Sequence, residues 1–205
     1  MVTRGTYSKG AARRQEILRT AMEVIARKGY NGTTLRAIGR ALGIEPAHII
    51  YYFGTREDLL REVVEQWSQD NRDLAKSTTD ALDQYATAIR QNLTIRGIVQ
   101  LYIAFAAEAV DPDHPAHDYF RERFATTSKM LSDAVREGQR QGLIKSELDP
   151  DRTARWLVAL ADGLQLQSLI DPRIDAPADL EGAIDGLFVS GTQSPLRQPP
   201  AHSNS

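Results

Sequence analysis

The chain of 205 residues contains no cysteine. This absence excludes a disulfide framework, a metal site built from thiolates and a cysteine nucleophile. The chain also has no run that approaches the ~18 consecutive apolar residues of a membrane-spanning helix, and its polar, basic beginning lacks the apolar core of a signal peptide. We therefore expect a cytoplasmic protein that does not span a membrane.

The motifs that mark common enzyme classes are absent as well. The sequence has no glycine-rich phosphate loop, no GxSxG segment and no HExxH segment. His114 and His117 stand among aspartates in the segment 111–118, but the two prolines and the high polarity there favour an exposed loop over a metal site. We expect no catalytic residues, no cofactor and no metal, although isolated carboxylates such as Glu108 and Asp162 could line a pocket.

The residues that are present favour helices. Hydrophobic residues make up 41% of the chain, which is enough for a sizeable core. Apolar residues recur at helical spacing along most of the sequence, and no run alternates for long as a half-buried strand does. The sequence predicts an all-α fold with one domain at 1–54, a second at 55–190, and a disordered tail at 191–205 that is rich in Pro, Ser and Gln.

The most informative motif is the segment 34–60, in which two short helices meet at Gly43. A glycine can end the first helix at little steric cost because it has no Cβ. Pro46 suits the first position of the second helix, and Glu45 is an imperfect N-cap before it. This spacing predicts a helix-turn-helix unit whose second helix enters the major groove of DNA. The residues that would pack the two helices together are apolar or small: Ile38, Gly39, Leu42, Ile44, Ile49 and Tyr52.

The second helix would present a small and partly aromatic surface to the outside. Ala47, His48 and Tyr51 point away from its apolar side and could lie close to base edges and thymine methyl groups. An αα-hairpin with a glycine turn and no DNA role would bury the same apolar residues. The competing interpretation of the whole chain is therefore a helical small-molecule-binding protein, enzyme or scaffold that does not bind DNA.

The segment 11–60 resembles the N-terminal domain of TetR-family transcriptional repressors. The resemblance rests on an amphipathic helix at 12–28 closed by Gly29, on Thr33-Thr34, on the glycine hinge, and on an aromatic run followed by Thr-Arg-Glu-Asp-Leu-Leu. It implies a three-helix helix-turn-helix domain followed by a C-terminal helical bundle that binds a ligand and dimerises. In the first helix it implies four inward residues: Ile17, Ala21, Val24 and Ile25.

The resemblance also implies which residues meet DNA. Positions that the family uses toward bases are occupied by Arg36, Ala47, His48 and Tyr51. Positions that contact the DNA backbone are occupied by Tyr52, Thr55 and Arg56, while Thr34 caps a helix whose N-terminus meets a phosphate. Two departures stand out: Ile50 replaces a common phosphate-contacting tyrosine, and Gly39 replaces the usual alanine at the tight helix crossing.

Basic side chains are concentrated at the beginning of the chain. Residues 1–60 contain ten Lys plus Arg and five Asp plus Glu, a net charge of +5, whereas residues 61–205 contain fifteen and twenty-two, a net charge of −7; together they make the −2 of the chain. Because DNA affinity depends largely on cations that contact phosphates, this asymmetry supports a DNA-binding first domain. A basic arm formed by Arg4, Lys9, Arg13 and Arg14 could cross phosphates or enter a minor groove. For Arg4 and Lys9, a solvated tail is an equal alternative.

Beyond residue 60 the chain is read from its own periodicity. Thr55 can cap a helix whose inward side carries Leu59, Leu60, Val63, Val64 and Trp67. Further helices are expected at 82–92, 98–109, 117–140, 149–170 and 178–189.

The expected helix at 149–170 has two apolar stripes and must be covered twice. One stripe runs through Leu157, Ala161, Leu164 and Ser168, and the other through Trp156, Leu160, Gly163 and Gln167. One cover is its own domain, and the other is the same helix of a second subunit, so that two helices from each subunit form a four-helix interface. An ordinary central helix in a monomer is the alternative. The residues that we expect at this homodimer interface are Leu157, Ala161, Leu164, Ser168, Leu180, Ile184, Leu187 and Phe188.

Together these features predict a ligand-responsive transcriptional regulator, and repression is a family expectation. A homodimer would bind an inverted repeat in double-stranded DNA, because one recognition helix reads only a few base pairs. The resemblance implies that a small-molecule effector in the second domain changes the spacing of the two reading heads and releases DNA. The candidates for the effector site are seven aromatic side chains and one methionine, although each such residue is more often core: Trp67, Tyr85, Tyr102, Phe105, Phe120, Phe124, Met130 and Trp156.

Overall fold

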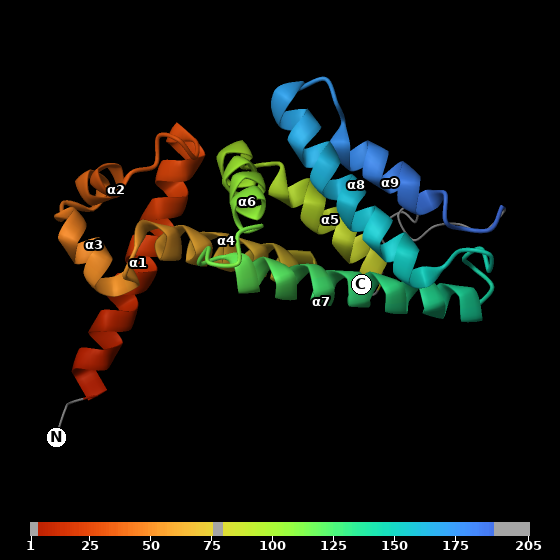
Figure 1. Cartoon of the computed structure of the whole chain (residues 1–205), viewed down its shortest axis with the longest axis horizontal. Helices are drawn as coiled ribbons and strands as arrows, with labels where there is room; N and C mark the ends of the chain where they lie inside the picture. Colours follow the sequence, from red (N-terminus) through yellow and green to blue (C-terminus); the bar gives the residue numbers. More distant parts are fainter. Residues whose placement is uncertain (1–3, 76–79, 191–205) are drawn as a thin grey trace, which may run out of the picture. The chain divides into compact units, whose positions relative to one another are not determined.

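The computed structural model describes residues 4–75 and 80–190. Within these residues the chain is built from helices joined by short connections, which confirms the all-α prediction (Figure 1). The expected disordered tail at 191–205 lies outside the described residues. The helices are α1 (Arg4–Lys28), α2 (Leu35–Leu42), α3 (Pro46–Phe53), α4 (Arg56–Ala75), α5 (Ala81–Asn92), α6 (Arg96–Glu108), α7 (His117–Arg140), α8 (Pro150–Ile170) and α9 (Ala176–Asp185).

The chain divides into two compact units that do not follow the expected domain boundary. Unit 1 comprises Met1–Asp70 and Thr94–Phe120, and unit 2 comprises Asn71–Leu93 and Arg121–Ser205. Helix α6 therefore belongs to the same unit as the helix-turn-helix segment, although α4 and α5 lie between them along the chain. The functional division at residue 54 stays a prediction.

Two helix boundaries differ from expectation. Helix α1 begins at Arg4 instead of Ala12, because no proline stops the helix before that point. Helix α9 ends at Asp185, because the backbone of the residues that follow makes hydrogen bonds to the segment 143–145 and does not continue the helix. The N–H of Val189 donates to the carbonyl of Leu143 at 2.9 Å, around an isolated antiparallel bridge between the segments 143–145 and 187–189.

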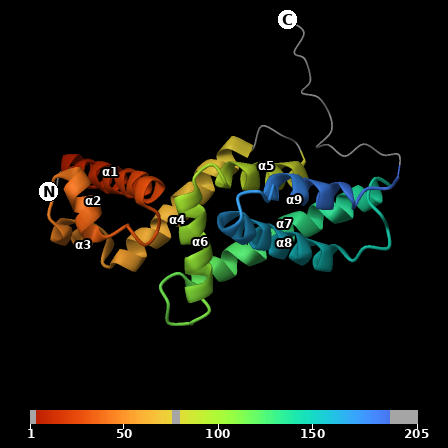
Figure 2. The ribbon, with the colours of Figure 1, turned by 90° about the horizontal axis from the view of Figure 1, so that it is seen from above.

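The head of unit 1 is the three-helix arrangement of α1, α2 and α3 (Figures 1 and 2). Gly43 has a φ of +67° and ends α2, as its position in the sequence predicts. A Cβ on Gly39 would lie 2.6 Å from the carbonyl oxygen of Ile44, so the two short helices cross at a distance that only glycine permits. The expected inward side chains are buried: Ile17, Ala21, Val24, Ile25, Ile38, Ile49, Leu59, Leu60, Val63, Val64 and Trp67.

A second close approach joins α6 to α1 within unit 1. A Cβ on Gly97 would lie 2.3 Å from the carbonyl oxygen of Ile25 and 3.4 Å from the Cα of Gly29. These neighbours are backbone atoms, which cannot turn aside as a flexible side chain can. The absence of a side chain at Gly97 therefore lets the beginning of α6 lie directly against the end of α1.

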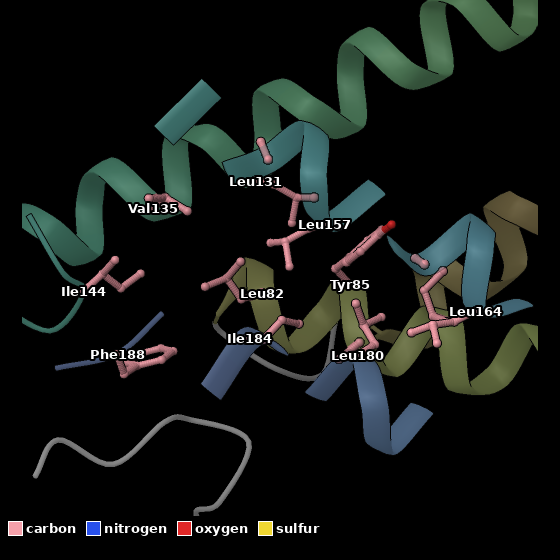
Figure 3. Packing of buried hydrophobic residues seen from close by; sticks show 14 of the residues in the cluster. Leu82, Tyr85, Leu131, Val135, Ile144, Leu157, Leu164, Leu180, Ile184 and Phe188 are labelled. Carbon is pink, nitrogen blue, oxygen red and sulfur yellow. The ribbon is translucent and has the colours of Figure 1, made fainter. Parts of the chain in front are cut away.

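The core of unit 2 corrects the predicted dimer interface. Figure 3 shows that Leu157 and Leu164 of α8 face Leu180 and Ile184 of α9 and Tyr85 of α5. A side chain that is covered by its own chain cannot also be covered by a second subunit, so this stripe of α8 is core. The correction applies to Leu157, Ala161, Leu164, Ser168, Leu180, Ile184 and Phe188, which are buried. Leu187 is only partly buried against the same cluster, so its place at the interface stays a prediction.

The other stripe of α8 remains exposed. Trp156 is 62% exposed and Ile170 is 77% exposed, and Leu160 and Leu166 between them also reach the surface. In the described part of the chain, no helix combines the length and the apolar character that a membrane crossing requires.

The approach at Gly97 can be tested by adding one methyl group. We expect Gly97→Ala to lower the free energy of unfolding by about 1–3 kcal/mol, because backbone atoms must move apart. Alanine in a helix is otherwise more favourable than glycine by about 1 kcal/mol. The matched control is Gly182→Ala in α9, where a Cβ would meet no atom within 4 Å and a small gain is expected. Urea unfolding at equal protein concentrations measures both, and a gain in stability for Gly97→Ala would contradict the close approach.

Candidate nucleic-acid interface

The beginning of α2 is capped as the sequence predicts. The hydroxyl oxygen of Thr34 accepts the N–H of Ala37 at 3.1 Å, and the extended backbone of Thr34 suits an N-cap. The preceding Thr33 is buried and donates its hydroxyl to the carbonyl of Gly29 at 2.8 Å. The loop between α1 and α2 is thereby held to the end of α1, while Thr34 itself stays exposed.

Helix α3 has one buried side and one exposed side. Ile49 and Phe53 are buried, whereas Ala47, His48 and Tyr51 are exposed, as expected for a helix that lies on the head with its outer face free. Tyr51 is 82% exposed, the largest exposure among the large hydrophobic side chains of the described residues. No Lys, Arg, Asp or Glu occurs in α3, so its outer face is uncharged.

Two tyrosines stiffen the end of this face. The rings of Tyr51 and Tyr52 meet edge to face, with centroids 5.3 Å apart and planes at 86°. Tyr52 is half-buried, so it fixes the direction of its exposed neighbour. Glu45 precedes α3 without a side-chain capping bond, which agrees with its description as an imperfect cap.

The half-buried side chain of Arg14 links three helices of unit 1. Arg14 of α1 donates to both carboxylate oxygens of Glu62 in α4, at 2.6 Å for the Nη2 bond, and its guanidinium lies 4.3 Å from the centre of the Phe53 ring. The hydrogen bonds that Arg14 donates to Glu62 raise the pKa of Arg14, so its guanidinium keeps its charge at neutral pH. Arg14 is therefore a clamp between α1, α3 and α4, and its charge is partly neutralised within the head.

Arg56 also makes contacts within the protein that the resemblance did not imply. Its Nε and Nη2 atoms donate to the carbonyl oxygen of Thr33 at 3.3 and 3.1 Å, and its side chain is half-buried. Thr55, beside it, is exposed and caps α4 by accepting the N–H of Asp58 at 3.0 Å. Thr55 is thus exposed but its hydroxyl also donates to the Asp58 carboxylate at 2.6 Å, whereas the guanidinium of Arg56 is held against the α1–α2 loop.

Sequence reasoning did not identify Arg40 as a candidate. Arg36 and Arg40 are both exposed on α2 and are one helical turn apart. The i, i+4 spacing of two arginines on the first helix of the motif is the signal that could have found Arg40. The two side chains are exposed cations on the helix that precedes α3.

The candidate effector residues do not meet in one place. Trp67, Tyr102 and Phe120 are buried in unit 1 and form a chain of rings, with centroids 6.4 and 5.4 Å apart. Phe105 is buried in the same unit, against Tyr30. Tyr85 belongs to the core of unit 2, where Met130 is partly buried.

The remaining two candidates lie at the surface of unit 2. Phe124 is half-buried in a groove of about 810 Å³ between α7 and α8, where Lys129, Arg136 and Asp151 supply charges. Trp156 lies exposed on α8, so the prediction that it lines a cavity inside this chain is wrong.

Comparison with known proteins identifies the family. Residues 17–63 match the family of bacterial regulatory proteins of the tetR type. Residues 79–189, more than half of the chain, match the C-terminal domain of BetI-type transcriptional repressors. The chain belongs to the TetR family.

Two relatives illustrate the distance within the family. The transcriptional repressor KstR2 of Mycolicibacterium smegmatis is 26% identical over 159 residues, which cover 74% of this chain and 77% of the relative. The transcriptional regulator BetI 2 of Chromohalobacter salexigens is 24% identical over 171 residues, which cover 78% and 79%.

Solved structures have the same fold. A TetR-family regulator from Rhodococcus sp. matches with a TM-score of 0.69 at 25% identity, over 86% of this chain and 98% of that one. A transcriptional regulator from Saccharomonospora viridis, solved in complex with choline, matches with a TM-score of 0.71 at 25% identity, over 87% and 98%. The chain is thus a TetR-family transcriptional regulator that binds DNA, and it is not an enzyme; members of the family bind small-molecule effectors, typically as dimers.

The geometry of α2 and α3 separates base recognition from phosphate contact. We expect Tyr51→Ala to weaken binding to the preferred sequence by about 1 kcal/mol and to leave binding to unrelated DNA unchanged, because an uncharged ring contacts bases and methyl groups. Arg40→Ala should weaken binding to all sequences and lower the salt slope by about 1. The control is Arg27→Ala, which removes an exposed arginine in the last turn of α1. Binding isotherms at several salt concentrations decide, and equal losses on both kinds of DNA for Tyr51→Ala would refute this assignment.

Proposed function

We propose that this TetR-family protein binds an inverted repeat in double-stranded DNA as a homodimer, represses transcription there, and is released by a small organic effector. The observation that carries the proposal is the outer face of α3, on which Ala47, His48 and Tyr51 are exposed together. Arg36, Arg40 and Thr55 surround this face with groups that can contact phosphates. In this proposal Thr34 and Tyr52 contact the DNA backbone, and Arg56 acts chiefly by holding the loop that carries Thr34.

The exposed stripe of α8 is the proposed dimer interface. Trp156 and Leu160 lie one helical turn apart, as do Leu166 and Ile170, and Gly163 leaves open space between the two pairs. An exposed apolar stripe of this length is costly in water, and a second α8 that crosses it around a twofold axis would cover it on both subunits at once. The interface therefore uses the opposite face of α8 from the one that packs in unit 2.

A homodimer is tested by placing a charge in this stripe. We expect Leu160→Arg to give a monomer of 22.8 kDa by light scattering at micromolar concentration, whereas the unchanged protein gives twice that mass. Leu143→Arg is the matched control, since Leu143 is 38% exposed and Leu160 is 36% exposed, but Leu143 lies in the 143–145 segment away from α8. A dimer that persists in Leu160→Arg, or a monomer for the unchanged protein, would contradict the proposal.

The effector is proposed to bind beside the aromatic cluster Trp67, Tyr102 and Phe120 of unit 1. Aromatic faces attract organic cations, and the choline complex of the Saccharomonospora viridis protein makes a quaternary ammonium compound the first effector class to test. Such an effector must favour the state that does not bind DNA, so its affinity for that state has to be the higher one.

The two tryptophans of the chain allow this to be measured directly. In Trp156→Phe, the fluorescence of Trp67 alone should change as choline is added, and the dissociation constant for operator DNA should rise by about tenfold to a hundredfold. The uncharged analogue 3,3-dimethylbutanol is the control, because it keeps the shape of choline without the positive charge. Trp67→Phe should show no fluorescence response. Operator binding that persists unchanged at saturating choline would reject this effector class but not the DNA-binding function.

A further inference from the structure

A chain of polar contacts runs from the end of α6 to the end of α1. The hydroxyl of Tyr30 donates to the Oε1 atom of Glu108 at 3.2 Å. Tyr30 follows Gly29, the residue that closes α1, and its ring meets Phe105 edge to face with centroids 6.1 Å apart. Burial is the main factor that raises the pKa of Tyr30, so the phenol keeps the proton that it donates. A carboxylate on α6 therefore holds the aromatic ring at the end of α1.

The other oxygen of Glu108 faces the loop between α6 and α7. Its Oε2 atom lies 3.5 Å from Nε2 of His114, but this contact lacks the geometry of a hydrogen bond. Nδ1 of His114 accepts the N–H of Ala116 at 3.2 Å, so in the neutral ring the proton is on Nε2. The imidazole also meets Phe105 edge to face at 5.2 Å. Glu108 thus lies between Tyr30, which donates a hydrogen bond to it, and His114, which does not.

Tyr30 also contacts an arginine of the helix-turn-helix segment. The guanidinium of Arg56 lies 5.5 Å from the centre of the Tyr30 ring, within the range of a cation–π interaction. The same guanidinium donates twice to the carbonyl of Thr33, the residue before the Thr34 cap of α2. The order of contacts is therefore Glu108, Tyr30, Arg56, Thr33 and then the N-terminus of α2.

We propose that Glu108 is a positioning residue for DNA binding, which acts on the N-terminus of α2 through Tyr30 and Arg56 without touching DNA. The inference rests on the DNA-binding function proposed above. Glu108 lies within residues 79–189, which match the BetI-type C-terminal domain, whereas Tyr30, Thr33 and Arg56 lie within residues 17–63, which match the tetR-type DNA-binding domain. The chain of contacts joins the two family regions at the point where α2 meets a phosphate. A displacement of α6 would release Tyr30 and, with it, the clamp on Thr33.

The test compares variants of the full chain on its operator DNA. Glu108→Ala and Tyr30→Phe should each weaken binding by about fivefold to tenfold, as expected for a coupling at the lower end of the usual range. The double variant should be no weaker than either single variant, because both changes break the same contact. Glu108→Gln should bind almost as well as the unchanged protein, because its amide oxygen still accepts the Tyr30 hydroxyl and only the charge is removed.

A matched tyrosine provides the control. Tyr119 donates its hydroxyl to Ser68 at 3.3 Å in the same unit, so Tyr119→Phe loses a comparable bond that is not part of this chain of contacts. Its DNA affinity should be unchanged. Losses that add up in the double variant, a loss of the same size in Tyr119→Phe, or failure of Glu108→Gln to bind would each overturn the inference.

Hydrogen exchange gives an answer that does not depend on DNA. The amide of Ala37, which Thr34 caps, should exchange about fivefold to tenfold faster in Glu108→Ala and Tyr30→Phe, and at the original rate in Tyr119→Phe and Glu108→Gln. If the unchanged protein binds no DNA, the proposed function fails, while these exchange rates still decide whether Glu108 acts on α2. Unchanged rates in Tyr30→Phe, the variant least able to disturb folding, would reject the positioning role.

Discussion

The backbone contact between α6 and α1 is the constraint on which the head of this protein depends. Gly97 has no Cβ, so the first turn of α6 reaches the carbonyl of Ile25 and the Cα of Gly29, where α1 ends. Gly29 turns the chain with a φ of +68°, and its carbonyl accepts the hydroxyl of Thr33. Because backbone atoms cannot yield as side chains do, the position at which α2 begins depends on the position of α6. The positions of α2 and α3 thus depend on a contact between the region that matches the tetR-type domain, residues 17–63, and the region that matches the BetI-type domain, residues 79–189.

In the proposed function, base recognition and phosphate binding belong to different helices of the head. The outer face of α3 carries no Lys, Arg, Asp or Glu, so it would discriminate bases through shape, methyl contacts, the Tyr51 hydroxyl and the imidazole of His48. The cations proposed to supply affinity lie on α2, at Arg36 and Arg40, and along α1. Other cations are used inside the protein, since Arg14 pairs with Glu62 and Arg56 binds the carbonyl of Thr33. The net charge of +5 in residues 1–60 therefore overstates what is free to meet phosphates.

The sequence predicted the elements of the head well because local signals agree there. Glycine at Gly43, proline at Pro46 and threonine at Thr34 each act within a few residues, and the structure has them as the end, the first turn and the cap of helices. The same reasoning was weaker for Arg56 and for the aromatic candidates. Whether an arginine meets a phosphate or a carbonyl, and whether a ring lines a cavity or fills a core, depends on neighbours that are distant in the sequence. Trp67 and Tyr102 are 35 residues apart, yet their rings are in contact.

The amino-acid sequence by itself determined that the chain is helical, where most helices begin and end, and that α8 has two apolar faces, because periodicity and capping are local properties. Only the tertiary structure decided which face of α8 packs in the chain's own core, because both faces are apolar and the choice depends on where α5 and α9 lie. It also decided that Glu108 meets Tyr30, since nothing in the sequence signals a contact between residues 78 positions apart. Proximity of this kind arises from the packing of helices, and a one-dimensional pattern of hydrophobic residues does not contain it.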